Sequence, residues 1–249
     1  MATTFPQAIR KPAAPSPVPG SGPSPFRNLF VARPTETLKP NEMLFWEGDP
    51  ADHVFEITSG CLRLYKLMPD GRRAITGFMF AGEILGVSFR DRYLFTAEAV
   101  TDVKLRRYAR SQMESNLARM PGLSRELLAV ACDELSAAQD QMLLLARKTA
   151  QERIASFLIT VAKRMSPGAA PTKEIELPMA RLDMADFLGL TIETVSRVLS
   201  KLKADGVIAL PTSHHVVIAK LASLRNMAGD EDVDFGPADR RIRAAAWPN

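Results

Sequence analysis

Residues 188–206, LGLTIETVSRVLSKLKADG, carry the pattern that decides the fold of the C-terminal part of the chain. Apolar side chains recur there at the spacing of one helix face, and they are Ile192, Val195, Val198, Leu199 and Leu202. Thr191 is a suitable N-cap for such a helix, and Gly206 suits the position just past its end. The segment therefore predicts an amphipathic helix with a defined beginning and end.

The residues just before this helix fit the first half of a helix-turn-helix. Such a motif needs a small residue where its two helices cross and a glycine with a left-handed backbone in the turn. With Ala185 at the crossing, Gly189 falls in the turn. The same register fills the remaining inward positions with apolar residues, which are Met184, Leu188, Leu190, Val195 and Val198. We therefore predict a helix-turn-helix over residues 180–205.

The same register leaves a polar face on the second helix, made of Glu193, Thr194, Ser196, Arg197, Ser200 and Lys201. In a helix-turn-helix, the first turns of the second helix enter the DNA major groove. There an Arg can donate two hydrogen bonds to guanine, and a Glu can accept one from the cytosine amine. The alternative is a surface Glu–Arg pair that stabilises the helix by about 0.2–0.5 kcal/mol. The candidate DNA contacts are Glu193, Ser196, Arg197, Thr191, Thr194, Ser200, Lys201, Arg181 and Ile192.

Residues 206–219, GVIALPTSHHVVIA, follow this helix and resemble two short strands around a turn. This is the pattern of the wing of a winged helix. His214 and His215 lie at the turn, where they could touch phosphate, although a hydrogen-bonded or solvated pair is the expected arrangement. Two adjacent histidines without a third ligand do not predict a metal site.

The N-terminal half has the pattern of short antiparallel strands. Between residues 36 and 107, runs of β-forming residues alternate with Gly and Pro. The sequence MPDG at residues 68–71 has the chemistry of a tight hairpin turn. Many short strands at close spacing predict an antiparallel β-roll.

Between these two parts, residues 121–147 predict one long helix. Leu128, Leu135 and Met142 recur every seven residues, and Ala131, Ala138 and Leu145 follow each of them by three. This is the a/d seam of a coiled coil, and the small Ala residues favour close approach of a second helix in a parallel homodimer. The alternative is a helix that packs against its own roll.

Together these patterns predict an α+β fold: an N-terminal antiparallel β-roll, a long dimerisation helix and a C-terminal winged helix-turn-helix. The expected parts are a disordered proline-rich arm (1–25), a sensor-like roll (26–120), the dimerisation helix (121–147), the DNA-binding domain (148–229) and a flexible tail (230–249).

The composition limits the classes of protein. Among the 249 residues there is no run of about 18 apolar residues, so no membrane span is expected. With only two cysteines, Cys61 and Cys132, a reducing cytoplasm is the expected compartment. Residues 147–229 carry 12 Lys and Arg against 7 Asp and Glu, and this basic excess favours a polyanionic partner. Motifs typical of enzymes, such as a P-loop or a nucleophile elbow, do not occur.

A roll, a heptad helix and a winged helix, in that order, resemble the Crp/Fnr family of bacterial transcription regulators over about residues 28–226. The sequence ETVSR, residues 193–197, is similar to the Glu-x-x-Ser-Arg recognition signature of the Fnr and FixK branch. Ile192 stands where members similar to the cyclic-AMP receptor have Arg. The resemblance implies base readout by Glu193, Ser196 and Arg197. FAGEILG, residues 80–86, resembles the Gly-Glu segment of the family's nucleotide-binding roll.

The chain departs from the family at residues that, in other members, bind the small molecule or cofactor that controls DNA binding. Where cyclic-nucleotide binders have an Arg and a Ser or Thr for the phosphate, this chain has YLFT, with Leu94 and Phe95, which cannot neutralise an anion. Glu83 could still meet a ribose hydroxyl or have a structural role. An iron–sulfur cluster is disfavoured because the arm has no cysteine, and Cys61 and Cys132 are expected to be small buried hydrophobes. A lone His53 does not predict haem.

The interpretation that remains is a FixK-like regulator without a cofactor. The resemblance implies a homodimer that binds double-stranded DNA at a palindrome of the type TTGAT–ATCAA and contacts RNA polymerase. It would act as an activator of genes for low-oxygen or nitrogen-oxide metabolism. The alternatives are a cyclic-nucleotide- or redox-responsive regulator of the same family, and a DNA-binding protein of loose specificity.

Overall fold

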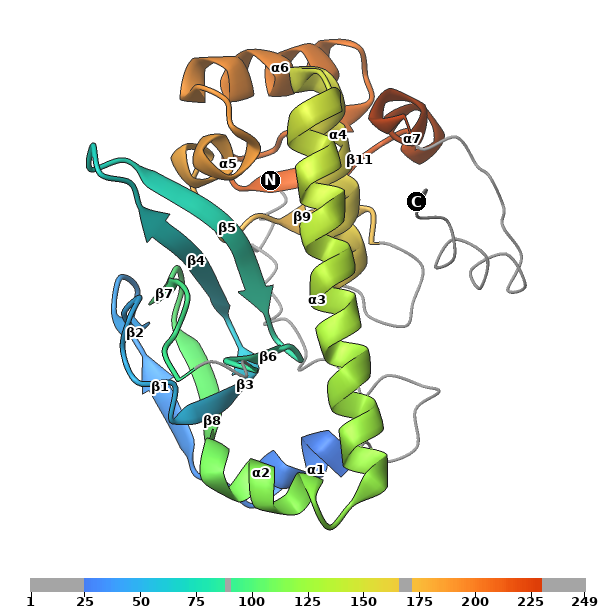
Figure 1. Ribbon diagram of the computed structural model, residues 1–249. Coiled ribbons are helices and arrows are strands. Elements are labelled where there is room, and N and C mark those ends of the chain that lie inside the picture. The colour runs from blue at the N-terminus through green and yellow to red at the C-terminus, as the bar shows by residue number, and fades with distance from the viewer. Residues whose placement is uncertain (1–24, 88–90, 166–171, 230–249) are drawn as a thin grey trace, which may run out of the picture.

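The structure of the chain, a computed structural model, describes residues 25–87, 91–165 and 172–229. A β-roll, the long helix α3 (Pro121–Arg147) and a winged helix-turn-helix follow one another (Figure 1). This confirms the predicted α+β class. The arm expected over residues 1–25 lies outside the described residues except for Pro25, and the expected tail, 230–249, lies wholly outside them. Within the described residues, no helix has both the length and the apolar character to cross a membrane.

The roll consists of two four-stranded sheets with antiparallel pairing, in the orders β1-β8-β3-β6 and β2-β7-β4-β5. Its strands are β1 (Thr35–Leu38), β2 (Met43–Phe45), β3 (His53–Ser59), β4 (Cys61–Leu67), β5 (Arg73–Phe80), β6 (Ile84–Leu85), β7 (Thr96–Ala99) and β8 (Val103–Ala109). Strand alternation puts one face inside: in β8, Val103 and Leu105 are buried, whereas Lys104 between them is exposed.

The hairpin between β4 and β5 forms at the predicted turn. Met68 N–H donates to the Arg72 carbonyl oxygen at 2.8 Å, and the Asp70 carboxylate accepts from Arg72 N–H at 3.0 Å. Gly71 has a φ of +83°, which only glycine adopts at little cost. The hairpin extends from the roll towards the C-terminal domain (Figure 1).

One end of the roll is covered by helices α1 (Pro25–Val31) and α2 (Arg110–Leu117) and by the first turns of α3. The proline-rich composition did not predict α1. It forms because Phe26 and Phe30, one helical turn apart, are both buried in one cluster with Leu123 and Leu127 of α3. The backbone N–H of Phe26 also donates to the Glu126 carboxylate at 2.8 Å.

The C-terminal domain contains α4 (Ala150–Arg164), β9 (Glu174–Glu176), α5 (Arg181–Leu188), α6 (Ile192–Ala204), β10 (Ile208–Ala209), β11 (His215–Ile218) and α7 (Leu221–Ala228). Strands β10 and β11 are the predicted wing, and β9 adds a third strand to give the order β10-β11-β9. The sequence pattern did not predict β9 or α7. β9 is three residues long and depends on pairing with β11, which is distant in sequence.

Candidate nucleic-acid interface

The helix-turn-helix has the geometry that its sequence predicts. Helix α5 ends at Gly189, which has a left-handed backbone with φ +61° and ψ +42°. Ala185 is buried where the helices meet, and its carbonyl oxygen accepts from Leu190 N–H at 3.0 Å. The other inward positions, Met184, Leu188, Val195 and Val198, are buried, and Leu190 is half-buried. The register read from the sequence is thus the register of the fold.

Helix α6 begins and ends where expected. The Thr191 hydroxyl accepts from Thr194 N–H at 3.2 Å, which satisfies one of the free amides of the first turn. At the other end Gly206 has a φ of +65°. The buried face carries Val195, Val198, Leu199 and Leu202. The opposite face therefore points away from the core along the whole helix.

The candidate contacts on α6 differ in exposure. Thr191, Ile192, Glu193, Arg197, Ser200 and Lys201 are exposed, whereas Thr194, Ser196 and, on α5, Arg181 are half-buried. Within the part of the chain that the structure describes, no ion pair joins Glu193 to Arg197. The guanidinium of Arg197 lies 3.5 Å from the Thr194 hydroxyl instead. The surface Glu–Arg pair considered above is therefore not formed.

The charge of Glu193 suits an acceptor. Its own backbone amide and the Thr191 hydroxyl hydrogen-bond to the carboxylate and hold the pKa of Glu193 below its usual value. The group is fully exposed, so this matters for its protonation state and contributes little to stability. An ionised Glu193 accepts hydrogen bonds and donates none.

Two side chains that the sequence did not single out connect the helix-turn-helix to the long helix. Arg153 of α4 donates to the Leu145 carbonyl oxygen of α3 at 2.8 Å and to the Leu188 carbonyl oxygen before the turn at 2.8 Å. Gln141 of α3 donates to the Phe187 carbonyl oxygen at 2.9 Å. These bonds set the place of α5 and α6 relative to α3. A pattern search could not find them because the acceptors are backbone carbonyls.

The histidines of the wing are paired within the protein. His214 Nδ1 lies 3.2 Å from the Leu177 carbonyl oxygen, and His215 Nε2 lies 3.9 Å from the Glu174 carboxylate. His214 is therefore at hydrogen-bond distance from a backbone carbonyl, whereas the His215 contact is too long for a hydrogen bond. Among the described residues, no group of three His, Cys, Asp or Glu side chains could hold a metal ion.

The heptad seam of α3 is exposed in the single chain. Leu128 is 65%, Leu135 61% and Met142 63% exposed, with Leu145 less so. Only the N-terminal turns of α3 pack against the chain's own roll, through Leu123 and Leu127. The beginning of α3 therefore packs against the roll, as the alternative expected, whereas the seam residues remain exposed in the single chain.

Two residues of the roll's nucleotide-binding-like segments, Glu83 and Tyr93, are engaged by other groups of the chain. Glu83 forms two hydrogen bonds with Arg164 of α4, at 2.8 and 2.6 Å, and accepts from Phe80 N–H at 2.9 Å. Tyr93 is buried, its hydroxyl donates to the His53 carbonyl oxygen at 2.8 Å, and its ring stacks on Phe45 with centroids 3.7 Å apart. These contacts give Glu83 the structural role rather than a ribose contact.

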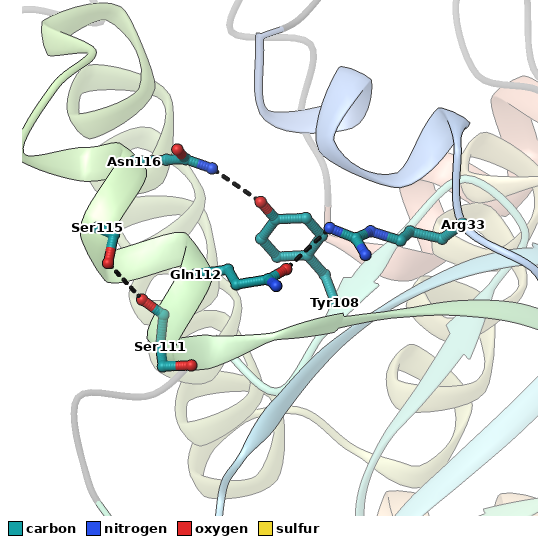
Figure 2. A pocket seen from close by; sticks show the side chains of 6 residues that line it. All are labelled: Arg33, Tyr108, Ser111, Gln112, Ser115 and Asn116. Atoms are coloured by element: carbon teal, nitrogen blue, oxygen red, sulfur yellow. Dashed lines mark hydrogen bonds between the residues drawn. The ribbon is translucent and has the colours of Figure 1, made fainter.

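A depression lies between α2 and the segment after α1. Figure 2 shows its lining side chains, which are Arg33, Tyr108, Ser111, Gln112, Ser115 and Asn116. Several of their polar groups pair with one another: Arg33 donates to Gln112 at 2.8 Å, and Asn116 donates to the Tyr108 hydroxyl at 2.7 Å. Nothing in this depression calls for a ligand.

The cysteines differ from each other. Cys61 is buried, as expected, and burial raises the pKa of its thiol to about 12. Cys132 lies on α3 and is exposed in the single chain, so the expectation of a buried residue was wrong there. The reason is geometric, because Cys132 follows Ala131 of the seam and points off the face that packs on the roll.

A capped, exposed helix in a winged helix-turn-helix defines a DNA-binding protein. The sequence comparisons agree. A model of the Crp-like helix-turn-helix domain matches residues 152–227, and one of the cyclic nucleotide-binding domain matches residues 35–120. The nitrogen fixation regulation protein FixK of Azorhizobium caulinodans is 43% identical over 75% of this chain and 76% of its own length.

Two further relatives support the same family assignment. The transcriptional activatory protein AadR of Rhodopseudomonas palustris is 43% identical over 69% of this chain and 72% of its own length. The structure of FixK2 from Bradyrhizobium japonicum superposes with a TM-score of 0.75 at 36% identity, and covers 79% of this chain and 98% of that one. The chain therefore belongs to the Crp/Fnr family of transcription regulators and is FixK-like.

Proposed function

We propose that this regulator is a homodimer that reads a palindrome of the type TTGAT–ATCAA, with α6 of each chain in the major groove. The half-site sequence is what the resemblance of residues 193–197 to the Fnr and FixK signature implies. The observation that supports reading by α6 is that Glu193 and Arg197 project from its first turns without pairing to each other. A dimer of such helices reads two half-sites about 34 Å apart, one turn of B-DNA.

Each exposed side chain of α6 then has a role. Arg197 forks onto guanine O6 and N7, and Glu193 accepts from a cytosine amine. Ile192 packs on a thymine methyl, and the half-buried Ser196 reaches a thymine or a neighbouring phosphate. The remaining contacts go to the phosphate backbone, from Thr191, Thr194, Ser200, Lys201 and Arg181.

The dimer rests on the seam of α3. Leu128, Leu135 and Met142 each leave more than half of the side chain in water in one chain, and a second copy of α3 would bury them. Ala131 and Ala138 let the two helices approach closely, and Leu145 ends the seam next to Gly189 of the helix-turn-helix. Two-fold symmetry of the protein matches the palindrome.

Regulation by cyclic AMP is not part of the proposal. Glu83 is engaged by Arg164, and Leu94 and Phe95 supply no charge for a phosphate. We propose a cytoplasmic activator that contacts RNA polymerase and catalyses no reaction, with target genes in low-oxygen or nitrogen-oxide metabolism. The target genes are inferred from the likeness to FixK proteins alone.

A cyclic-nucleotide-responsive regulator is the second candidate, because the roll matches the cyclic nucleotide-binding domain model. One titration separates the two. The purified protein is titrated with a TTGAT–ATCAA duplex, with and without cyclic AMP, under oxidising and reducing conditions. Specific binding that is equal in all conditions supports the proposal. Binding that requires cyclic AMP, or that changes with redox state, supports the alternative.

A further inference from the structure

Strand β5 and the residues just after it contact the winged helix-turn-helix at three places. Figure 1 shows β5 running along this domain up to α5. Cys61, Tyr65, Ile75, Phe78 and Phe80 from β4 and β5 belong to the same apolar core as α4, α5 and α6. The roll and the DNA-binding domain are thus packed together over one continuous surface, which polar groups border.

A buried ion cluster marks the beginning of β5. Arg63 of β4 donates to both oxygens of Asp183 on α5, each at 3.3 Å, and also pairs with Glu98. Arg73 donates to Asp183 at 3.2 Å and lies 3.5 Å from Asp186. The Arg63 and Asp183 side chains are only 12% and 4% exposed. Asp183 is the carboxylate that both arginines contact, so its charge favours the arrangement of the two domains in which α5 lies against Arg63 and Arg73.

An aromatic contact lies in the second half of β5. The ring centroid of Phe78 on β5 lies 5.5 Å from that of Phe187 on α5 and 6.3 Å from that of Phe157 on α4. Both pairs are edge-to-face, the geometry in which aromatic rings attract.

A forked ion pair marks the end. Arg164 is the last residue of α4, and its guanidinium meets both oxygens of Glu83 just after β5, at 2.8 and 2.6 Å. The same group donates to the Phe78 carbonyl oxygen at 2.6 Å. Two parallel hydrogen bonds from a planar guanidinium to a carboxylate fix the relative orientation of the two groups as well as their distance.

These contacts matter because the chain is not helical where α3 meets α4. Lys148 and Thr149 have extended backbones, with ψ angles of 142° and 165°. Beside this break, Gln141 and Arg153 hold the helix-turn-helix to the end of α3. The roll is fixed to the beginning of α3 through Leu123 and Leu127. Contacts along β5 therefore give the DNA-binding domain a second attachment to α3, through the roll.

We propose that Asp183 with Arg63 and Arg73, and Glu83 with Arg164, are positioning residues that fix the separation of the two reading helices without a bound ligand. The inference rests on the proposed function, since it concerns how the DNA is read. None of these side chains has to touch DNA. They act through the orientation of α5 and α6.

The test uses the full-length protein and Asp183→Asn. The amide oxygen of Asn can still accept from Ala180 N–H at the start of α5, as Asp183 does at 3.4 Å. The charge and one of the two oxygens that accept from the arginines are lost. Affinity is measured for the TTGAT–ATCAA palindrome and for versions with the spacer one base pair shorter or longer. Wild type should discriminate sharply among the three. The variant should bind the best site about tenfold more weakly and lose most of the discrimination.

Two further variants keep the test decisive if Asp183→Asn does not fold. Arg73→Gln changes a side chain that is 26% exposed, and Glu83→Gln removes the charge facing Arg164. Both variants should also show smaller differences in affinity among the three spacer lengths. Arg107→Gln is the matched control, because it removes an ion pair with Glu36 that lies within the roll, and its spacing preference should equal that of wild type.

The outcomes distinguish a failure of the positioning role from a failure of the proposed function. A wild type that discriminates spacers, together with folded variants that discriminate equally well, overturns the positioning role and leaves the proposed function intact. A lowered melting temperature with unchanged spacing preference has the same meaning, since a purely stabilising cluster would behave so. If wild type binds none of the palindromes, the proposed function fails and the positioning role fails with it.

Discussion

Replacing Leu135 and Met142 by Glu should convert the protein to a monomer. Fully burying a Leu or Met side chain contributes about 1.5–3 kcal/mol. In the single chain these two side chains are 61% and 63% exposed, so pairing would add about 1–2 kcal/mol for each. Four such side chains in a dimer contribute about 4–8 kcal/mol, or roughly a thousandfold to a millionfold in the dimer dissociation constant. Like charges facing each other across the seam would weaken it further.

Sedimentation velocity over a concentration series measures the change. The matched control is Leu143→Glu, because Leu143 is 61% exposed on the same helix but lies off the seam. We expect wild type and Leu143→Glu to sediment as dimers, and the double variant as a folded monomer with a normal circular dichroism spectrum. A double variant that stays dimeric, or a control that dissociates equally, would refute the assignment of the seam.

Three other predictions follow from single residues. Iodoacetamide at pH 8 should label Cys132 in the native protein and Cys61 only after unfolding. Burial raises the pKa of Cys61 to about 12, so its thiol stays protonated. Rapid labelling of Cys61 in the native protein would contradict this. Gly189→Ala should lower the free energy of unfolding by about 1–2 kcal/mol, because Gly189 has a left-handed backbone. The control Gly122→Ala adds a methyl group in open space and should not lower it. Urea titrations measure the free energy of unfolding of both variants. Lys201→Ala should weaken binding to all DNA sequences alike and reduce the salt slope by about one unit, and a sequence-selective loss would show that Lys201 reads a base.

The parts predicted well from sequence are those with local causes. The helix-turn-helix register depends on Gly189, Ala185 and an apolar period within about 25 residues, and the fold keeps it unchanged. The hairpin turn at Gly71 is equally local. Composition, however, is a poor guide to α1, whose Phe26 is buried only because Leu123, almost a hundred residues later, covers it.

The parts that sequence reasoning missed depend on contacts between distant elements. Arg153 acts through backbone carbonyls, which leave no trace in side-chain patterns. The contact of Asp183 with Arg63 spans 120 residues. Asp183 lies within the helix-turn-helix, but its pattern assigns no partner to that position, and Arg63 belongs to no motif. Glu83 was visible as part of a motif, yet the motif allowed both a ribose contact and a structural role, and only the position of Arg164 decides between them.

The measurement that tests the account most directly is the affinity of wild type and Arg197→Ala for two palindromes, of the TTGAT and TGTGA types, and for a TTGAT-type site with its guanine replaced. Wild type should prefer the TTGAT type. Arg197→Ala should lose roughly 1–3 kcal/mol per half-site on the matched palindrome and no longer distinguish the guanine-substituted site. Equal losses on the matched and the substituted sites would mean that Arg197 contacts only the DNA backbone, and would contradict the proposal that α6 reads this sequence.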